Sequence, residues 1–173
     1  MGEAVLGEAR SAVSHVEERL HALGFSLPAA PPPIATFVPA VEAGGLLFIS
    51  GQGPISMGEA AFVGRVGQAV TKSEGYEAAR LCVLNCLAVA RDTLGSLNRI
   101  ERVVHLRGFV NSANTFYDQP AIINGASDLL VDLFGENGQH ARAALGVSSL
   151  PGNIPVEIEM ILAVRPAKDQ PDG

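Results

Sequence analysis

Two long amphipathic helical patterns constrain the fold of this chain more than any other feature. The first covers about residues 73–94, and Gly95 is a good stop after it. The second covers about residues 114–134 and stops at Gly135, with Pro120 either in its first turns or in a break before it. One face of the first helix carries Ala78, Leu81, Cys82, Asn85, Cys86, Val89 and Thr93. Helices with such faces need another layer to cover them.

Apolar segments with strand character surround the two helices. They lie at 35–42, 46–50, 62–66, 100–110, 142–147 and 155–164. Gly44-Gly45 is a hairpin turn signal between the first two, and residues 51–55 break the second strand and begin a loop. The order β-β-(β)-α-β-α-β-β predicts a two-layer α+β domain, with both helices on one face of a mixed or mostly antiparallel sheet.

The chain is expected to have three parts. Apolar residues at helical spacing predict an amphipathic helix over residues 8–23, with Gly24 as its stop. The segment LPAAPPP at 27–33 predicts a stiff extended linker. Residues 1–33 are thus an appendage, residues 34–165 form the α+β domain, and residues 166–173 form a loose polar tail.

The charge of the chain argues against a nucleic-acid partner. The net charge is −6, and the 12 basic residues are scattered without a run. A phosphate backbone is bound mainly through clustered Lys and Arg. The charged fraction of 17% and the mean hydropathy of +0.25 predict a somewhat apolar surface. Part of that surface would be covered by copies of the same chain.

Cys82 and Cys86 lie four residues apart on one face of the first long helix, where a disulfide does not fit easily. Buried free thiols are expected. The alternative, half of a metal site, would need His or Cys partners that the spacing does not supply. Reduced thiols, together with an N-terminus (MGEAVLGEAR) that does not read as a signal peptide, predict a cytoplasmic protein. No apolar run approaches the ~20 residues of a membrane span, so we expect no contact with membranes.

The segment 141–160, ARAALGVSSLPGNIPVEIEM, carries the clearest signs of a ligand site. Arg142 enters an apolar strand, and after a turn at 148–153 the chain returns in a strand with Glu157 and Glu159. Arginine is costly to bury and binds a carboxylate through two parallel hydrogen bonds. The segment predicts a small carboxylate-bearing ligand with an acid/base group beside it.

Other positions are candidates for the same site. Ser50 and Gly51 end a buried strand, where they could cradle an anion or a carbonyl, although such a pair is most often a plain turn. Asn124 lies inside the apolar pattern of the second helix and either serves the site or bonds to a neighbouring carbonyl. Glu157 and Glu159 share one strand face, which borders either solvent or an interface cleft.

His105 and His140 are candidates for general acid/base work. His105 lies in a strand, where it is structural or exposed, whereas His140 lies in a Gly-rich loop just before Arg142 and could flank a cleft entrance. The sequence has no Ser/His/Asp order, no HxxxH spacing, no P-loop and no paired-glycine dinucleotide motif.

Taken together, these residues resemble the Rid family, the reactive intermediate deaminases, also called YjgF-like and often labelled endoribonuclease L-PSP. The resemblance covers about residues 34–164. Its most specific pieces are GGLLFISGQGP at 44–54, ARAA at 141–144, LP at 150–151 and VEIE at 156–159. The resemblance implies a chorismate-mutase-like fold and a homotrimer with three clefts between subunits. It also implies hydrolysis of enamine or imine acids, such as 2-aminoacrylate and 2-iminobutanoate, to 2-keto acids and ammonia, without a metal or organic cofactor.

The same resemblance assigns roles to single residues. Arg142 falls on the arginine that clamps the substrate carboxylate, and Glu157 falls on the glutamate that helps to hold the attacking water. Ser50 and Gly51 fall on the pair that lines the pocket, and Asn124 falls on the helix asparagine near the site. In this family the activity would therefore be carried by Arg142 and Glu157.

Two positions depart from the family pattern. Ala144 stands where many members have cysteine, and Phe37 stands where many have tyrosine. Ala144 keeps a backbone carbonyl, whereas Phe37 lacks the tyrosine hydroxyl, which puts substrate preference in doubt. A trimeric small-carboxylate-binding or regulatory protein without turnover is therefore the alternative function. A ribonuclease fits poorly, because the chain is acidic and lacks an evident His pair.

Overall fold

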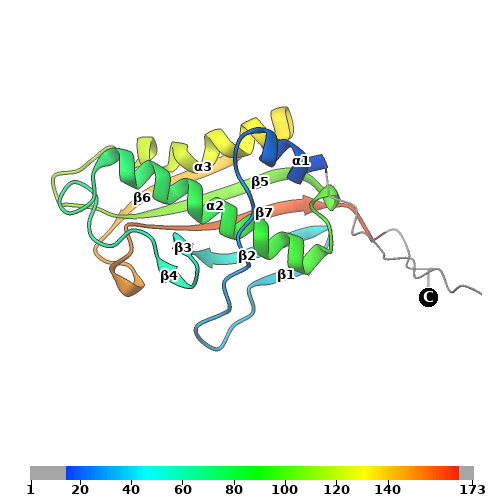
Figure 1. Cartoon of the computed structure of the whole chain (residues 1–173), viewed down its shortest axis with the longest axis horizontal. Coiled ribbons are helices and arrows are strands. Elements are labelled where there is room, and N and C mark those ends of the chain that lie inside the picture. The colour runs from blue at the N-terminus through cyan, green and yellow to red at the C-terminus, as the bar shows by residue number, and fades with distance from the viewer. Residues whose placement is uncertain (1–14, 168–173) are drawn as a thin grey trace, which may run out of the picture.

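The structure, a computed structural model, describes residues 15–167 (Figure 1). The predicted α+β class, with a mixed sheet and two long helices, is confirmed. The elements in chain order are α1 (His15–Ala22), β1 (Ala40–Ala43), β2 (Leu46–Gln52), β3 (Ile55–Ser56), β4 (Glu59–Ala60), α2 (Lys72–Leu94), η1 (Leu97–Arg99), β5 (Ile100–Asn111), α3 (Gln119–Phe134), η2 (Gly135–Gly138), β6 (Ala141–Val147), η3 (Pro151–Asn153) and β7 (Val156–Val164).

Five strands form one mixed sheet in the order β1-β2-β7-β5-β6. β5 and β6 pair in parallel, and every other neighbouring pair is antiparallel. The parallel pair is possible because α3 provides the long crossover between β5 and β6. β3 and β4 form a separate small hairpin.

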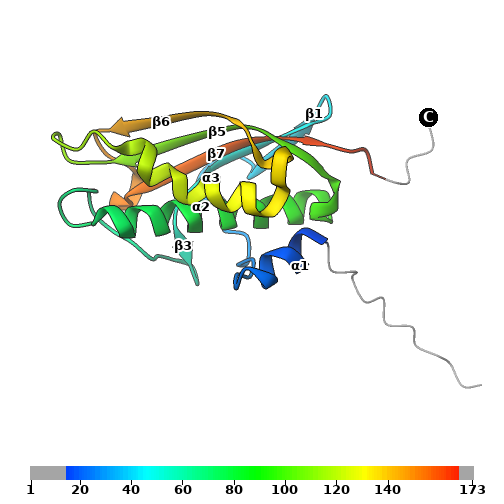
Figure 2. The same ribbon diagram turned by 90° about the horizontal axis from the view of Figure 1, so that it is seen from above.

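Helices α2 and α3 cover one face of the sheet, and no other described helix or strand covers the opposite face (Figures 1 and 2). α2 begins with a capping box, in which the Thr71 hydroxyl accepts from the Glu74 N–H and the Glu74 carboxylate accepts from the Thr71 N–H. It ends at Gly95, whose left-handed φ of 76° closes the last turn. The predicted start and stop of this helix agree with the structure.

α3 begins at Gln119, which is later than the predicted start near residue 114. Pro120 lies in the first turn of the helix. A proline is tolerated there because its missing N–H would have had no partner, whereas further inside it would break the ladder of hydrogen bonds. Of the two placements left open for Pro120, the structure has the first-turn one.

Glycines allow the close packing of the helix layer. A Cβ at Gly125 of α3 would lie 2.0 Å from the carbonyl oxygen of Tyr76 in α2. A Cβ at Gly108 of β5 would lie 2.4 Å from Ile123 Cδ1. The core between helices and sheet is apolar, and its largest fully buried side chains include Leu47, Leu87, Leu106, Ile122, Leu130, Ile158, Met160 and Leu162.

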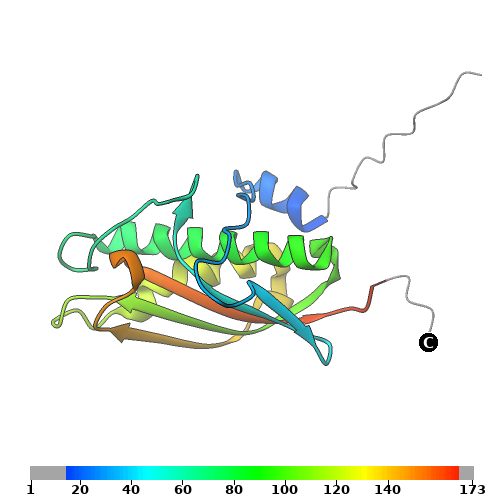
Figure 3. The same ribbon diagram turned by 90° about the horizontal axis from the view of Figure 1, so that it is seen from below.

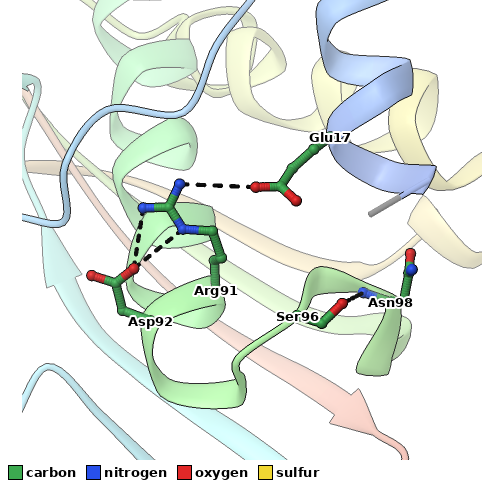
Figure 4. A network of polar contacts seen from close by, with 5 residues as sticks. All are labelled: Glu17, Arg91, Asp92, Ser96 and Asn98. Carbon is green, nitrogen blue, oxygen red and sulfur yellow. Dashed lines mark hydrogen bonds and ion pairs between the residues drawn. The ribbon is translucent and has the colours of Figure 1, made fainter. Parts of the chain in front are cut away.

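Helix α1 docks on the helix layer, on the side away from the sheet (Figure 2). Leu20 is fully buried, and Arg91 of α2 forms ion pairs with Glu17 at 3.8 Å and with Asp92 at 3.1 Å (Figure 4). In the adjacent turn, the Asn98 N–H donates to the Ser96 hydroxyl at 3.2 Å (Figure 4). Residues 8–14 of the predicted helix, and residues 168–173 of the predicted tail, lie outside the described residues.

Between α1 and β1 the chain crosses α2 on its way to the sheet (Figure 3). The predicted strand at 35–42 begins only at Ala40. Pro39 precedes it and has no N–H to give to a ladder. The carbonyl of Pro39 instead accepts from the Ser50 N–H at 2.9 Å.

Two predictions on the next strands were wrong. β2 does not end at Ser50 but continues to Gln52, because a bulge between Ile49 and Gln52 accommodates the extra residues. No strand forms over 62–66, where Val66 makes only isolated bridges and Gly64 has a φ of 118°. The small hairpin β3–β4 forms instead, with positive φ at both Met57 and Gly58, as a tight hairpin turn requires.

The two cysteines are free and fully buried, as predicted. Burial raises the pKa of both thiols, and each Sγ lies 3.5 Å from a carbonyl oxygen of β7. Within residues 15–167, no group of three or more His, Cys, Asp or Glu is arranged to hold a metal ion. In the same range, no helix is long and apolar enough to span a membrane.

Candidate functional site

A cavity of about 560 Å³ lies where the end of β2, the start of β7 and the proline-rich segment before β1 meet. Four of the predicted site residues line it: Phe37, Ser50, Gly51 and Glu157. Glu159 lines it as well. The other predicted residues, Arg142, Asn124 and Ala144, do not line this cavity.

Gly51 is in contact with Glu157. An added Cβ at Gly51 would lie 2.5 Å from Glu157 Oε1, 2.9 Å from Cδ and 3.2 Å from Cγ. Real Cβ atoms do not approach other heavy atoms so closely, so the Glu157 side chain occupies space that only glycine leaves free. Gly51 therefore determines where the carboxylate of Glu157 can lie.

Ser50 holds the segment that carries Phe37. Its hydroxyl donates to the carbonyl of Val38 at 2.8 Å, and its N–H donates to the carbonyl of Pro39. The hydroxyl proton is therefore already used in a hydrogen bond within the protein, whereas the lone pairs of the oxygen can still accept a hydrogen bond from a ligand. Phe37 lines the cavity and is 43% exposed.

Asn85 supports the cavity wall from inside the helix layer. It is fully buried, and its Nδ2 donates to the carbonyls of Gly53 at 2.9 Å and Ile55 at 3.0 Å. Its Oδ1 is a buried atom without a hydrogen-bond partner in the described part of the chain. The helical pattern places Asn85 on a buried face, but nothing in the sequence indicates that it ties α2 to the loop that follows β2.

Glu157 is half-buried and carries no ion pair within residues 15–167. Burial raises its pKa above the ordinary value of 4.5, and the neighbouring charge of Glu159 raises it further. Glu159 itself forms an ion pair with Arg107 of β5 at 2.8 Å. A carboxylate whose pKa is raised by burial and that faces a cavity is suited to accept and return a proton.

Arg142 lies in a second cluster, between β6 and α3. Its Nη1 donates to Asn124 Oδ1 at 2.8 Å and to Ser127 Oγ at 3.1 Å. The guanidinium remains exposed and has no carboxylate partner among the described residues. The side chain of Asn124 thus accepts a hydrogen bond from Arg142 and not from a neighbouring backbone group, and Ser127 is a contact that sequence reasoning missed.

His140 completes this cluster through a directed chain of hydrogen bonds. Its Nδ1 lies 2.6 Å from the carbonyl of Gly138, which can only accept, so Nδ1 carries the proton and donates. Nε2, at 3.0 Å, then accepts from the Ser127 hydroxyl. Burial lowers the pKa of His140, and the charge of Arg142 lowers it further against the raising effect of the Gly138 bond. A neutral His140 therefore accepts the proton of the Ser127 hydroxyl, which leaves the lone pairs of Ser127 Oγ free to accept from Arg142.

His105 lies on the uncovered face of the sheet, where it pairs with Ala141 of β6, the residue between His140 and Arg142, and its interaction with His140 helps to lower the pKa of His140. It lines a cavity of about 340 Å³ with Phe48, Arg107 and Glu159.

The two clusters lie on opposite faces of the sheet in a single chain. Arg142 is paired with Leu106, which is fully buried beneath the helices, and Ala144 is paired with the buried Gly108 on the same side. Glu157 is paired with Phe109, on the uncovered side. Because residues paired across strands point to the same face, one chain does not bring Arg142 and Glu157 together.

Comparison with known proteins agrees with this fold and pattern. Residues 17–161 match the family model described as "YjgF/chorismate_mutase-like, putative endoribonuclease". Protein TCP17 of Trypanosoma cruzi is 41% identical over 152 residues, which cover 87% of this chain and 95% of that protein.

Two solved structures are similar over most of their length. The protein Atu1372 of Agrobacterium tumefaciens, described as of unknown function, is 45% identical with a TM-score of 0.82 and covers 87% of this chain and 93% of its own. TdcF of E. coli, solved with bound serine, is 26% identical with a TM-score of 0.57 and covers 79% of this chain and 94% of its own. From its sequence pattern, its mixed sheet and the match over residues 17–161, the chain belongs to the YjgF family.

Proposed function

We propose that this protein hydrolyses small enamine or imine acids, of the 2-aminoacrylate and 2-iminobutanoate type, to 2-keto acids and ammonia. One observation carries the proposal. Among residues 15–167, Arg142 is an oriented cation without a carboxylate partner and Glu157 is a carboxylate without a cation, and the fold keeps them on opposite faces of the sheet. A site built from both residues needs two copies of the chain, with Arg142 from one and Glu157 from the next.

A homotrimer with sites at the subunit interfaces provides such an arrangement. The uncovered sheet face carries the exposed apolar side chains Val41, Phe48 and Leu145, whose exposed fractions are 49%, 42% and 47%. Apolar side chains gathered on one face mark an interaction surface. Membership of the family, in which trimers are typical, supports the same assembly.

The chemistry requires modest assistance, because the carbon of a protonated imine is already electrophilic. Arg142 holds the substrate carboxylate through parallel hydrogen bonds and fixes the carbon against one water. Glu157 accepts a proton from that water as its oxygen bonds to the carbon. The proton then passes to nitrogen. As the C–N bond breaks, the new hydroxyl group gives its remaining proton to Glu157, so that ammonia leaves and a 2-keto acid is released. Ala144 contributes its backbone carbonyl, and no metal or organic cofactor takes part.

A coupled assay tests the activity. An amino-acid oxidase or dehydratase generates the imine, and its disappearance is followed with wild-type protein, with Arg142→Ala and with Arg19→Ala as the control. Arg19 is an exposed arginine on α1, far along the chain from either cluster. We expect Arg142→Ala to lose at least about 10²-fold in kcat/KM, since it removes one side of a charged pair. Near-normal activity of Arg142→Ala would contradict the proposed role.

Subunit complementation tests the shared site. Arg142→Ala and Glu157→Ala should each keep only a small residual activity as pure proteins. When the two are co-expressed, random trimers should contain intact sites at about one quarter of their interfaces. Activity in the mixture that stays at the residual level of the pure variants, with assembly verified by light scattering, would refute a site formed by two subunits.

The alternative is a trimeric small-carboxylate-binding or regulatory protein without turnover. The loss of the tyrosine hydroxyl at Phe37 favours it, because the cavity then offers one polar contact fewer. TdcF was solved with bound serine, a small amino acid that carries a carboxylate. This supports a carboxylate-bearing ligand for either function. Tight binding of a small carboxylate in a thermal-shift screen, with no turnover of any imine, would favour the binding protein.

A further inference from the structure

The cavity that contains Glu157 has a large apolar half. Six of its lining residues are Pro31, Pro32, Ile34, Phe37, Ile55 and Ile154, and the polar residues Ser50 and Glu157 lie in the same cavity. None of the lining residues is Lys, Arg or His. The volume of about 560 Å³ is far larger than a three-carbon acid requires.

The apolar wall is built from two anchored segments. On one side, Leu27 and Ala30 pack against the core, and the Arg80 guanidinium lies 5.2 Å from the ring centre of Phe25. On the other side, Asn85 holds the carbonyl of Ile55 at 3.0 Å. The wall therefore exists before any ligand arrives, so a ligand need not order it.

In a single chain, exposed apolar surface remains on this wall. Ile34 is 86% exposed and Phe37 is 43% exposed, although both border the cavity. A ligand that placed an apolar group against them would remove this surface from water. A substrate with a one-carbon side chain would leave it exposed.

We propose that the preferred ligands are 2-imino acids with a branched or aromatic side chain, which lies against Ile34, Phe37 and Ile154 while the reacting carbon faces Glu157. This specificity rests on the proposed deaminase site. Each fully buried methylene strengthens binding about fourfold. The three additional carbons of a leucine-derived acid would then give at most about sixtyfold over an alanine-derived one. Because the cavity is partly open, we expect about tenfold.

The test separates binding from turnover. Calorimetry on the full-length protein measures the affinity for pyruvate and for 4-methyl-2-oxopentanoate, the stable keto acids of the two series. Turnover is measured with imines generated by an amino-acid oxidase from alanine and from leucine. The variant Ile34→Asp places a charge in the apolar wall without emptying the core, because Ile34 is already exposed. Met57→Asp is the matched control, since Met57 is 99% exposed and does not line this cavity.

The expected result is about tenfold tighter binding of the branched acid, a preference that Ile34→Asp abolishes and Met57→Asp retains. Equal affinities for the two acids, or a preference untouched by Ile34→Asp, would overturn the apolar subsite. In that case, turnover of the small imine would still support the deaminase function. A clear preference in binding without any turnover would retain the subsite and refute the deaminase function. Binding of neither acid together with no turnover would overturn both.

Discussion

Replacing Gly51 by alanine should disable the deaminase activity without unfolding the protein, because the added methyl group displaces Glu157. The new Cβ would lie 2.5 Å from Glu157 Oε1 and 2.9 Å from Cδ. Non-bonded carbon contacts are optimal near ~3.5 Å, so the carboxylate must withdraw by about 1 Å. A displacement of this size costs about 10²-fold in rate. That loss corresponds to about 2.7 kcal/mol of transition-state stabilisation.

The same substitution should change stability little. Gly51 is not among the residues with positive φ, so alanine can adopt its backbone conformation. The atoms that the methyl group meets all belong to one side chain beside a cavity, and that side chain has room to move. We expect the Tm of Gly51→Ala to lie within about 3 °C of the wild type.

A double-mutant cycle identifies the cause of the lost activity. In Glu157→Ala the side-chain atoms that would meet the new methyl group are gone, so adding Gly51→Ala should reduce the residual rate no further. The assay is imine disappearance at saturating and limiting substrate, with thermal melts of all four proteins. If Gly51→Ala keeps wild-type activity, or lowers the rate equally in the Glu157→Ala background, its action through Glu157 is refuted.

Gly125→Ala should destabilise the fold by about 3 kcal/mol or more, because its Cβ would lie 2.0 Å from the backbone oxygen of Tyr76 and force α2 and α3 apart; chemical denaturation measures the loss. Asn85→Ala should cost about 1–3 kcal/mol, because two backbone carbonyls of the cavity wall each lose a donor; a wild-type denaturation midpoint would contradict this. The acid limb of kcat/KM should lie above pH 4.5, because burial and Glu159 raise the pKa of Glu157, which acts ionised. Glu159→Gln removes one of the two causes, so its pH profile should shift toward lower pH, and a shift upward would refute the assignment.

The order of elements could be read from the sequence where a single local signal decides it. Gly95 was the expected stop of the first long helix, and α2 ends there; α2 begins at Lys72, next to the expected start near residue 73, where the local capping box of Thr71 and Glu74 fixes it. β5 and β7 follow their apolar patterns closely. Sequence reasoning failed where the tertiary context decided, as at the predicted strand 62–66. There the positive φ of Gly64 and the contacts of Val66 with Val70 and Ser112 replace a ladder.

The candidate site was predictable as a set of residue types, but its arrangement was not. An arginine in an apolar strand and a glutamate in the next one indicated a carboxylate ligand, and Asn124 was expected nearby. The roles of Ser127 and Asn85 had no sequence signal, because serine and asparagine occur in many helices for other reasons. Their importance here comes from the hydrogen bonds to Arg142 and to the carbonyls of Gly53 and Ile55.

The sequence by itself determined the α+β class, the buried faces of the helices and the identity of the charged residues, because periodicity and side-chain chemistry are local properties. Only the tertiary structure decided that Arg142 and Glu157 lie on opposite faces of the sheet. The reason is register: side chains alternate along a strand, so a shift of one residue reverses every face. Pairing between strands distant in sequence sets that register, and no local pattern contains it.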